Sequence, residues 1–279
     1  MGIVPDFIGN SNFISNIKGI VKSVSESPAP VLLTGERGSG KRLFAQHVHL
    51  SYSNDFKGFY EINCMALEGD EIKDIIEKII FTASGFSRST LYLNNVDSLS
   101  EEVQISFNES FLSRLEQKNI KIISSCLTEI QDTQKFNPDL YFKLSVVKLN
   151  FPPLRQRTQD ILPVAEFYLN KFRKGSGLNF KGFSETAELF MKQYFWKGNC
   201  DELINSVQRA FIVGSNELIS EDDLGLSLSD REYSDMIKSQ ADKVHDKTLS
   251  EAVNDFKKEY LIKVLEENGW NQKKTPKLL

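Results

Sequence analysis

The feature that most constrains this chain is a glycine-rich turn between an apolar run and an apolar helix, at residues 30–42 (PVLLTGERGSGKR). Gly35, Gly38 and Gly40 let the backbone curl so that successive N–H groups point at one anion. Lys41 adds a positive charge, and the following helix adds its N-terminal dipole. An ordinary glycine turn can match this pattern by chance, but the strand-like residues before it and the apolar helix after it favour a phosphate-binding loop (P-loop). The segment therefore predicts a bound nucleotide.

Short apolar runs alternate with helical patterns over residues 3–151. The runs are residues 31–34, 59–63, 90–94, 120–126 and 146–150. Five strands separated by helices predict an α/β fold with a five-stranded parallel sheet covered on both faces. Beyond Pro152 and Pro153, apolar residues recur at helical spacing, which predicts a small all-helical lid.

These patterns predict four segments along the chain. They are an α/β nucleotide-binding subdomain (1–153), a helical lid (154–220), a linker (221–247) and a C-terminal helical segment (248–279). The linker is acidic, then polar, and only weakly periodic. Residues 249–268 carry an amphipathic pattern that predicts a helix. This helix either pairs two chains or packs on its own domain, and the sequence leaves both open.

Composition excludes several classes of protein. No apolar run is long enough to span a membrane, and residues 1–10 lack the pattern of a secretory signal, so we expect a cytoplasmic protein with no membrane partner. Cys64, Cys126 and Cys200 have no CxxC spacing, which favours reduced thiols over a metal site. The net charge of −4 gives no general attraction to nucleic acid.

A P-loop protein that hydrolyses ATP needs acidic residues at the end of a second strand, to hold the Mg²⁺ shell and to orient the attacking water. Here the strand at residues 90–93 is followed by Asn94 and Asn95. Asparagine carries no charge and is no base near neutral pH. Asp97 would reach this place only if the strand end changed its register. The sequence therefore predicts nucleotide binding without the acid pair needed for cleavage.

Five motifs, taken in order, resemble the AAA+ domain of bacterial sigma-54-dependent transcription activators. They are GERGSGKR (35–42), NCMAL (63–67), DLYFKLSVV (139–147), PPLRQR (152–157) and YFWKGNCDEL (194–203). Residues 248–274 resemble the start of the Fis-type DNA-binding domain that follows in such proteins. The resemblance implies an AAA+ domain that binds ATP between subunits of a ring, hydrolyses it, and remodels the sigma-54 polymerase through a loop carrying the motif GAFTGA.

The resemblance also assigns a nucleotide-binding set to this chain. Its members are Ile8 and Gly9, expected against the adenine, and the loop residues Gly35, Glu36, Arg37, Gly38, Ser39, Gly40, Lys41 and Arg42. Arg42 stands where the family commonly has Glu. Arg155 and Arg157 are expected at the joint between sheet and lid. The implied cofactor is ATP or ADP, and Mg²⁺ is left open.

The positions where active family members carry out chemistry differ in this chain. The acid pair is replaced by Asn94 and Asn95, and the sensor Asn is replaced by Leu127. The two arginines that the family inserts into a neighbouring subunit are replaced by Asn137 and Lys143, and the sensor arginine of the lid is replaced by Asp201. Losing the planar guanidinium groups removes stabilisation of the transition state. A carboxylate at position 201 repels phosphates. We therefore expect no catalytic residues and a degenerate, hydrolysis-deficient member.

Contacts with partners are less well determined. No GAFTGA motif occurs, and the stretch between Asn63 and Asn94 is roughly a dozen residues shorter than in the family pattern, as in the NtrX-type branch. Contact with the sigma-54 polymerase is therefore left unexplained. The Fis-like segment is expected to stop before its recognition helix, which leaves DNA contact without a reading element. The expected partner is a second copy or a related AAA+ regulator, in a homo-oligomer or hetero-oligomer.

Two alternatives stay open. One is an active, ring-forming ATPase that activates the sigma-54 polymerase and recruits Asp97 and Lys143 as replacements. The other is a remnant that binds no nucleotide and acts by pairing with a full-length relative. Binding and turnover of ATP separate these functions.

Overall fold

The computed structural model describes residues 6–53, 57–86, 88–127, 136–174, 180–214 and 217–226. The chain divides into two units, Met1–Leu226 and Ser227–Leu279, and all described residues belong to the first. The predicted C-terminal helix at 249–268 and most of the predicted linker lie outside the described residues.

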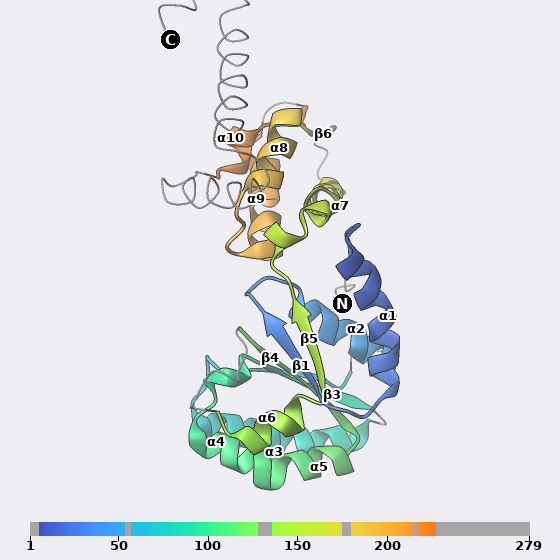
Figure 1. Cartoon of the computed structure of the whole chain (residues 1–279), viewed down its shortest axis with the longest axis vertical. Coiled ribbons are helices and arrows are strands. Elements are labelled where there is room, and N and C mark those ends of the chain that lie inside the picture. Colours follow the sequence, from blue (N-terminus) through green and yellow to red (C-terminus); the bar gives the residue numbers. More distant parts are fainter. Residues whose placement is uncertain are drawn as a thin grey trace, which may run out of the picture. The chain divides into compact units, whose positions relative to one another are not determined.

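A parallel sheet with the strand order β2-β3-β4-β1-β5 forms the centre of the first unit (Figure 1). The strands are β1 (Val31–Gly35), β2 (Phe59–Asn63), β3 (Ser89–Asn94), β4 (Ile120–Cys126) and β5 (Val147–Phe151). Each lies within one residue of a predicted strand. The five-stranded parallel sheet is therefore confirmed.

Helices cover both faces of the sheet, as predicted. One face carries α1 (Asn12–Glu26) and α2 (Lys41–Ser53), and the other carries α3 (Gly69–Thr82), α4 (Glu101–Ser106), the π-helix η3 (Phe107–Phe111), α5 (Leu112–Gln117) and α6 (Pro138–Leu144). Successive side chains of a strand point to opposite faces. Leu32 accordingly packs against the α3 face, whereas Val31 and Leu33 pack against α1 and α2. Burial on both faces explains why this strand is a continuous apolar run.

The sheet brings the predicted site residues to one edge. β1 lies between β4 and β5, with Thr34 beside Cys126 and Gly35 beside Phe151. Because all strands are parallel, their carboxyl ends meet at one edge, where ligands of such sheets bind. The P-loop, Asn95 and Leu127 directly follow β1, β3 and β4 there.

The lid follows β5 through two 3-10 turns, η5 (Leu154–Gln156) and η6 (Thr158–Asp160). Its helices are α7 (Ile161–Arg173), α8 (Glu185–Gln193), α9 (Asn199–Val213) and α10 (Glu221–Leu224). The predicted lid is helical, but it also contains a parallel pair of two-residue strands, β6 (Gly182–Phe183) and β7 (Leu218–Ile219). Such short strands leave no alternating pattern in a sequence. Among the described residues, no helix combines the length and apolar content needed to cross a bilayer.

Candidate nucleotide site

The P-loop has the backbone that its glycines predict. Gly35, Gly38 and Gly40 have φ angles of 143°, 74° and 106°, a region that favours glycine. Ser39 lies within this curl, and its hydroxyl is buried without a hydrogen-bond partner in the structure. A buried donor without a partner costs free energy until a ligand accepts from it. The loop therefore fits an anion with phosphate oxygens.

Lys41 is the first residue of α2 and is buried against the loop. Its Nζ donates hydrogen bonds to the carbonyl oxygens of Gly35, at 2.5 Å, and of Glu36, at 2.8 Å. Burial lowers the pKa of Lys41, and nearby negative groups that include Asp97 and Asp201 oppose this shift. The structure thus holds a positive charge at the base of the loop.

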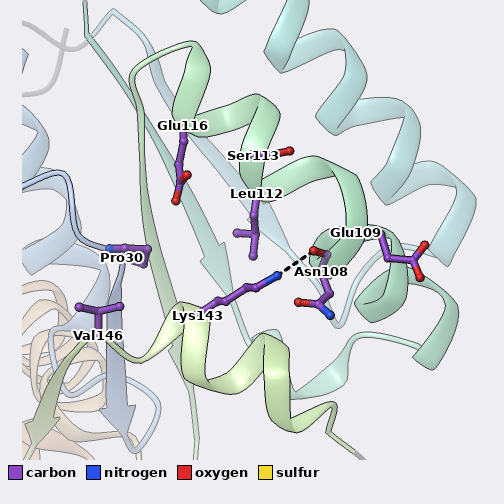
Figure 2. Close-up of a pocket in the computed structure, with 8 residues that line it drawn as sticks. All are labelled: Pro30, Asn108, Glu109, Leu112, Ser113, Glu116, Lys143 and Val146. Carbon is purple, nitrogen blue, oxygen red and sulfur yellow. Dashed lines mark hydrogen bonds between the residues drawn. The ribbon is translucent and has the colours of Figure 1, made fainter.

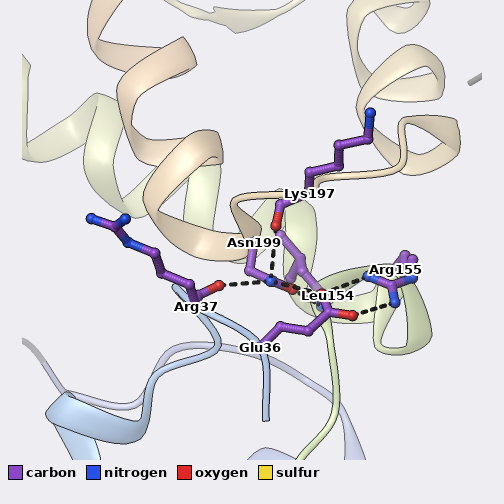
Figure 3. Close-up of polar contacts among 6 residues, drawn as sticks. All are labelled: Glu36, Arg37, Leu154, Arg155, Lys197 and Asn199. Carbon is purple, nitrogen blue, oxygen red and sulfur yellow. Dashed lines mark hydrogen bonds and ion pairs between the residues drawn. The ribbon is translucent and has the colours of Figure 1, made fainter. Parts of the chain in front are cut away.

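A first set of polar contacts joins the loop to the lid (Figure 3). Arg155 donates to both carboxylate oxygens of Glu36, at 2.7 and 2.5 Å, and this contact lowers the pKa of Glu36. The buried side chain of Asn199 donates to the Glu36 carboxylate, at 3.1 Å, and to the Arg37 carbonyl, at 2.8 Å. Its oxygen accepts from the backbone N–H of Leu154, at 2.7 Å. We call the connection formed by η5 and η6 (residues 154–160) the hinge. One amide therefore joins the loop, the hinge and the lid.

A second set lies on the other side of the same loop. The backbone N–H of Cys200 donates to the Gly38 carbonyl, at 3.1 Å. Arg157 donates to the Ser39 carbonyl, at 2.6 Å, and pairs with Asp160, at 3.8 Å. A methyl group built on Gly38 would overlap the carbonyl oxygen of Gly198. The lid therefore touches the loop backbone directly, and position 38 requires glycine.

Asp160 also holds the segment that was expected to lie against the adenine. Its carboxylate accepts from the backbone N–H and the hydroxyl of Ser11, at 2.8 and 2.7 Å. A methyl group built on Gly9, which has φ 145°, would overlap this carboxylate. Ile8 is partly buried. The N-terminal segment is thus fixed next to the hinge, and its place against the adenine stays a prediction.

The two asparagines at the end of β3 are held by neighbouring polar side chains. Asn94 lies beside Ser125 of β4 and accepts from its hydroxyl, at 2.9 Å. Asn95 has a left-handed backbone, with φ 58°, and donates to the Asn63 side chain, at 3.1 Å. The strand keeps its register, so Asp97 lies past its end in the 3-10 turn η2 (Val96–Ser98). Its Oδ1 is buried without a hydrogen-bond partner in the structure.

Three further predicted positions surround the loop. Arg42 pairs with Glu61 of β2 at 2.7 Å, so a carboxylate offsets its charge. Asp201 lies in the first turn of α9, and its Cγ is 3.3 Å from a methyl group built on Gly38. Leu127 follows β4 and is exposed. Asp201 therefore places a negative charge at the tip of the loop.

Asn137 directly precedes α6, and Lys143 lies in the last turn of this helix. Asn137 caps this helix: its side chain accepts from the backbone N–H of Leu140, at 3.0 Å. The signal was present in the sequence, because Asn followed by Pro is typical of a helix start. The nearby Gln104 accepts from the Asn137 backbone N–H, at 2.7 Å. The residue at this arginine position therefore has a local structural role.

Lys143 lines a cavity of about 420 Å³ (Figure 2). The lining residues are Pro30, Asn108, Glu109, Leu112, Ser113, Glu116, Lys143 and Val146. The Nζ of Lys143 donates to the Asn108 carbonyl, at 3.1 Å. Pro30 and Val146 directly precede β1 and β5, so this cavity lies at the amino ends of the strands. Within one chain, Lys143 is therefore separate from the P-loop.

The part that Asn199 plays was not predicted from the sequence. The signal available was the Asn in GNCDEL, a residue type with two donors and an acceptor, at the first position of a helix. The sequence does not predict that the hinge and the P-loop both bind to this amide. Among the described residues, no group of three or more His, Cys, Asp and Glu side chains could hold a metal ion.

Family comparisons agree with this geometry. The sigma-54 interaction domain matches residues 8–154, and the AAA+ ATPase lid domain matches residues 155–241. The transcriptional regulatory protein ZraR of Klebsiella oxytoca is 28% identical over 289 residues, which cover 95% of this chain and 64% of that protein. The alginate biosynthesis transcriptional regulatory protein AlgB of Pseudomonas aeruginosa is 30% identical over 234 residues, or 74% of this chain and 51% of that protein. The chain thus spans less than two thirds of these relatives.

Solved structures of NtrX from Brucella abortus share the fold. The complex with ADP has a TM-score of 0.69 at 22% identity and covers 99% of this chain and 66% of that chain. The complex with ATP has a TM-score of 0.68 at 22% identity and covers 98% of this chain and 66% of that chain. At this identity the likeness supports the fold alone.

Proposed function

Because the chain belongs to the sigma-54 interaction domain family and carries the AAA+ lid behind that domain, we propose that it is a transcription regulator that binds ATP or ADP and hydrolyses nucleotide poorly or not at all. One observation carries the proposal. The loop has the curled backbone that suits phosphate, whereas the strand that would supply the catalytic acids ends at Asn94 and is followed by Asn95.

Binding is supported by the chemistry of the loop. Its curled backbone, the unpaired Ser39 hydroxyl and the Lys41 ammonium group are donors or charges that suit phosphate oxygens. NtrX of Brucella abortus was crystallised with ADP and with ATP. These points favour residues 35–41 as the phosphate site, with Ile8 and Gly9 near the adenine of the nucleotide. Mg²⁺, if bound with the nucleotide, would offset part of the charge of the phosphates.

The proposed hydrolysis defect follows from the charges of the side chains at the catalytic positions. Asn94 and Asn95 are engaged with Ser125 and Asn63, and neither can accept a proton from water near neutral pH. Lys143, at one of the two arginine positions, offers a point charge without a planar fork. Nucleotide would then act as a ligand that stabilises one arrangement of domain, lid and neighbour by mass action.

The proposed partner is a second copy or a related AAA+ regulator. Lys143, at one of the two arginine positions, lies away from the loop of its own chain, at the amino ends of the strands. That placement is consistent with contact to a neighbour.

Calorimetric titration of the full chain with ATP and with ADP, run beside a phosphate-release assay, tests the proposal. We expect binding of nucleotide and phosphate release no faster than in a protein-free control. Absence of any binding would contradict the proposal and favour a nucleotide-free remnant.

One observation favours an active ATPase as the second candidate. Asp97 carries a buried carboxylate oxygen without a hydrogen-bond partner in the structure, and its charge acts on Lys41. Steady phosphate release that is lost in both Lys41→Ala and Asp97→Asn would establish this function instead.

A further inference from the structure

The positive charges around the P-loop are largely engaged by carboxylates. Arg155 is bound to Glu36 by two hydrogen bonds, and Arg157 pairs with Asp160. Arg42 pairs with Glu61. A guanidinium group already paired with a carboxylate has less attraction left for a phosphate.

The two remaining cations of the loop differ in where they lie. Lys41 lies at its base, on the carbonyl oxygens of Gly35 and Glu36. Arg37 is exposed and extends away from the contacts between loop and lid (Figure 3). The fixed charge for phosphate is therefore that of Lys41, at one end of the site.

The lid supplies a negative charge at the tip of the same loop. The backbone contact between Cys200 and Gly38 fixes the first turn of α9 against the loop, at 3.1 Å. The next residue is Asp201, whose Cγ lies 3.3 Å from a methyl group built on Gly38. The charge of Asp201 is also close enough to act on Lys41. A phosphate chain bound along this loop would therefore lie near a carboxylate.

We infer that Asp201 makes this a site for nucleoside diphosphates, so that the chain binds ADP in preference to ATP. This inference rests on the proposed nucleotide binding. The loop N–H groups would cradle the first two phosphates of either nucleotide, and Lys41 would reach the second and the third. The third phosphate of ATP adds further negative charge near Asp201, and like charges at short range repel. Asp201 is then a specificity-determining residue.

A divalent cation gives the competing outcome. Asp97 has one carboxylate oxygen without a partner in the structure, and it also acts on Lys41. Mg²⁺ held at such carboxylates would turn their repulsion of a triphosphate into a net attraction. Affinities must therefore be compared both in EDTA and in Mg²⁺.

The test is calorimetric titration of the full chain with ADP and with ATP, in EDTA and in Mg²⁺, for the unmodified chain and for Asp201→Asn. Asp222→Asn is the matched control, because Asp222 is an exposed aspartate in the first turn of another lid helix, α10. We expect ADP to bind about 10-fold more tightly than ATP in both conditions. Asp201→Asn is expected to tighten ATP about 5- to 10-fold and ADP less than 2-fold, while Asp222→Asn leaves both unchanged.

Several outcomes would overturn the inference. They are equal affinities in the unmodified chain, an equal effect of Asp201→Asn on both nucleotides, and a preference for ATP in Mg²⁺. If the unmodified chain bound neither ADP nor ATP, the proposed function would be overturned together with the inference. Thermal melting without nucleotide verifies that both variants are folded.

Discussion

Two buried lysines lie at opposite ends of the same sheet and make nearly the same contacts. Lys41, at the carboxyl end, donates to the carbonyl oxygens of Gly35 and Glu36. Lys121, in β4 near the amino end, donates to the carbonyl oxygens of Ser27 and Ala29, at 2.7 and 3.1 Å. They are 6% and 3% exposed, respectively. Burial and carbonyl contacts alone therefore do not distinguish a ligand site from a structural lysine.

The difference lies in what surrounds each ammonium group. Burial lowers the pKa of Lys121 to about 8, and no other cause of the shift is resolved. Around Lys41, negative groups that include Asp97 and Asp201 oppose the effect of burial. Only Lys41 adjoins a loop of curled N–H groups. In the proposed phosphate site the loop and its charges act together, and the lysine is one part of it.

The largest expected effect separates the two lysines by ligand binding. Lys41→Ala is expected to weaken nucleotide binding at least 100-fold, because hydrogen bonds to charged groups contribute about 1.5–3 kcal/mol each. Lys121→Met is the matched control, and its nucleotide affinity is expected to stay within about 2-fold of the unmodified chain. Calorimetric titration with ADP measures both. Equal losses in the two variants would remove the contrast.

The second prediction concerns a substitution that removes a contact of the loop around Lys41 and leaves the lysine in place. Asn199→Ala is expected to lower the free energy of unfolding by about 2 kcal/mol, because the buried N–H of Leu154 loses its acceptor. Asn119→Ala is the control, since Asn119 has the same φ of 53° but is exposed. That variant is expected to cost about 1 kcal/mol or less. Urea denaturation compares the two, and a smaller loss at position 199 would contradict the prediction.

The third prediction concerns the amino end of the sheet and pH. Because the pKa of Lys121 falls from 10.5 in the unfolded chain to about 8 in the fold, the unfolded chain binds more protons above pH 8. Stability is therefore expected to rise with pH relative to Lys121→Met, by about 1 kcal/mol between pH 7.5 and 9. Denaturation at both pH values measures the difference. A constant difference would show that the lysine titrates normally.

The smallest effect is expected at the ion pair between loop and hinge. Arg155 lowers the pKa of Glu36 below its usual 4.5, so the pair stabilises the fold above that pH and loses its effect as pH falls through the lowered pKa. Glu36→Gln is expected to cost only about 0.5–1 kcal/mol at pH 7, because the carboxylate is 39% exposed and solvent screens it. This cost is expected to shrink as pH falls below 4.5 and the carboxylate becomes protonated. A cost that does not change with pH would indicate a hydrogen-bond effect instead.

The sheet could be predicted because its strands are continuous apolar runs separated by helical patterns. The P-loop could be predicted because three glycines and a lysine leave few other backbones. The contacts of Asn199 could not be predicted, since Glu36, Arg37 and Leu154 are far from it in the sequence. Asn137 was judged by the side chain it replaces, whereas the structure uses it as a helix cap. Propensities describe neighbours in sequence, and these contacts depend on neighbours in space.

The contact between Gly38 and Gly198 limits how the lid can move. The backbones of Gly38 and Gly198 meet without intervening side chains and are already at their closest approach. The lid therefore cannot move closer to the P-loop at this contact. A ligand that displaces the lid must lift it, and lifting breaks the Cys200 hydrogen bond together with those of Asn199. Lid opening is therefore expected to be cooperative, an all-or-none release in place of a gradual hinge rotation.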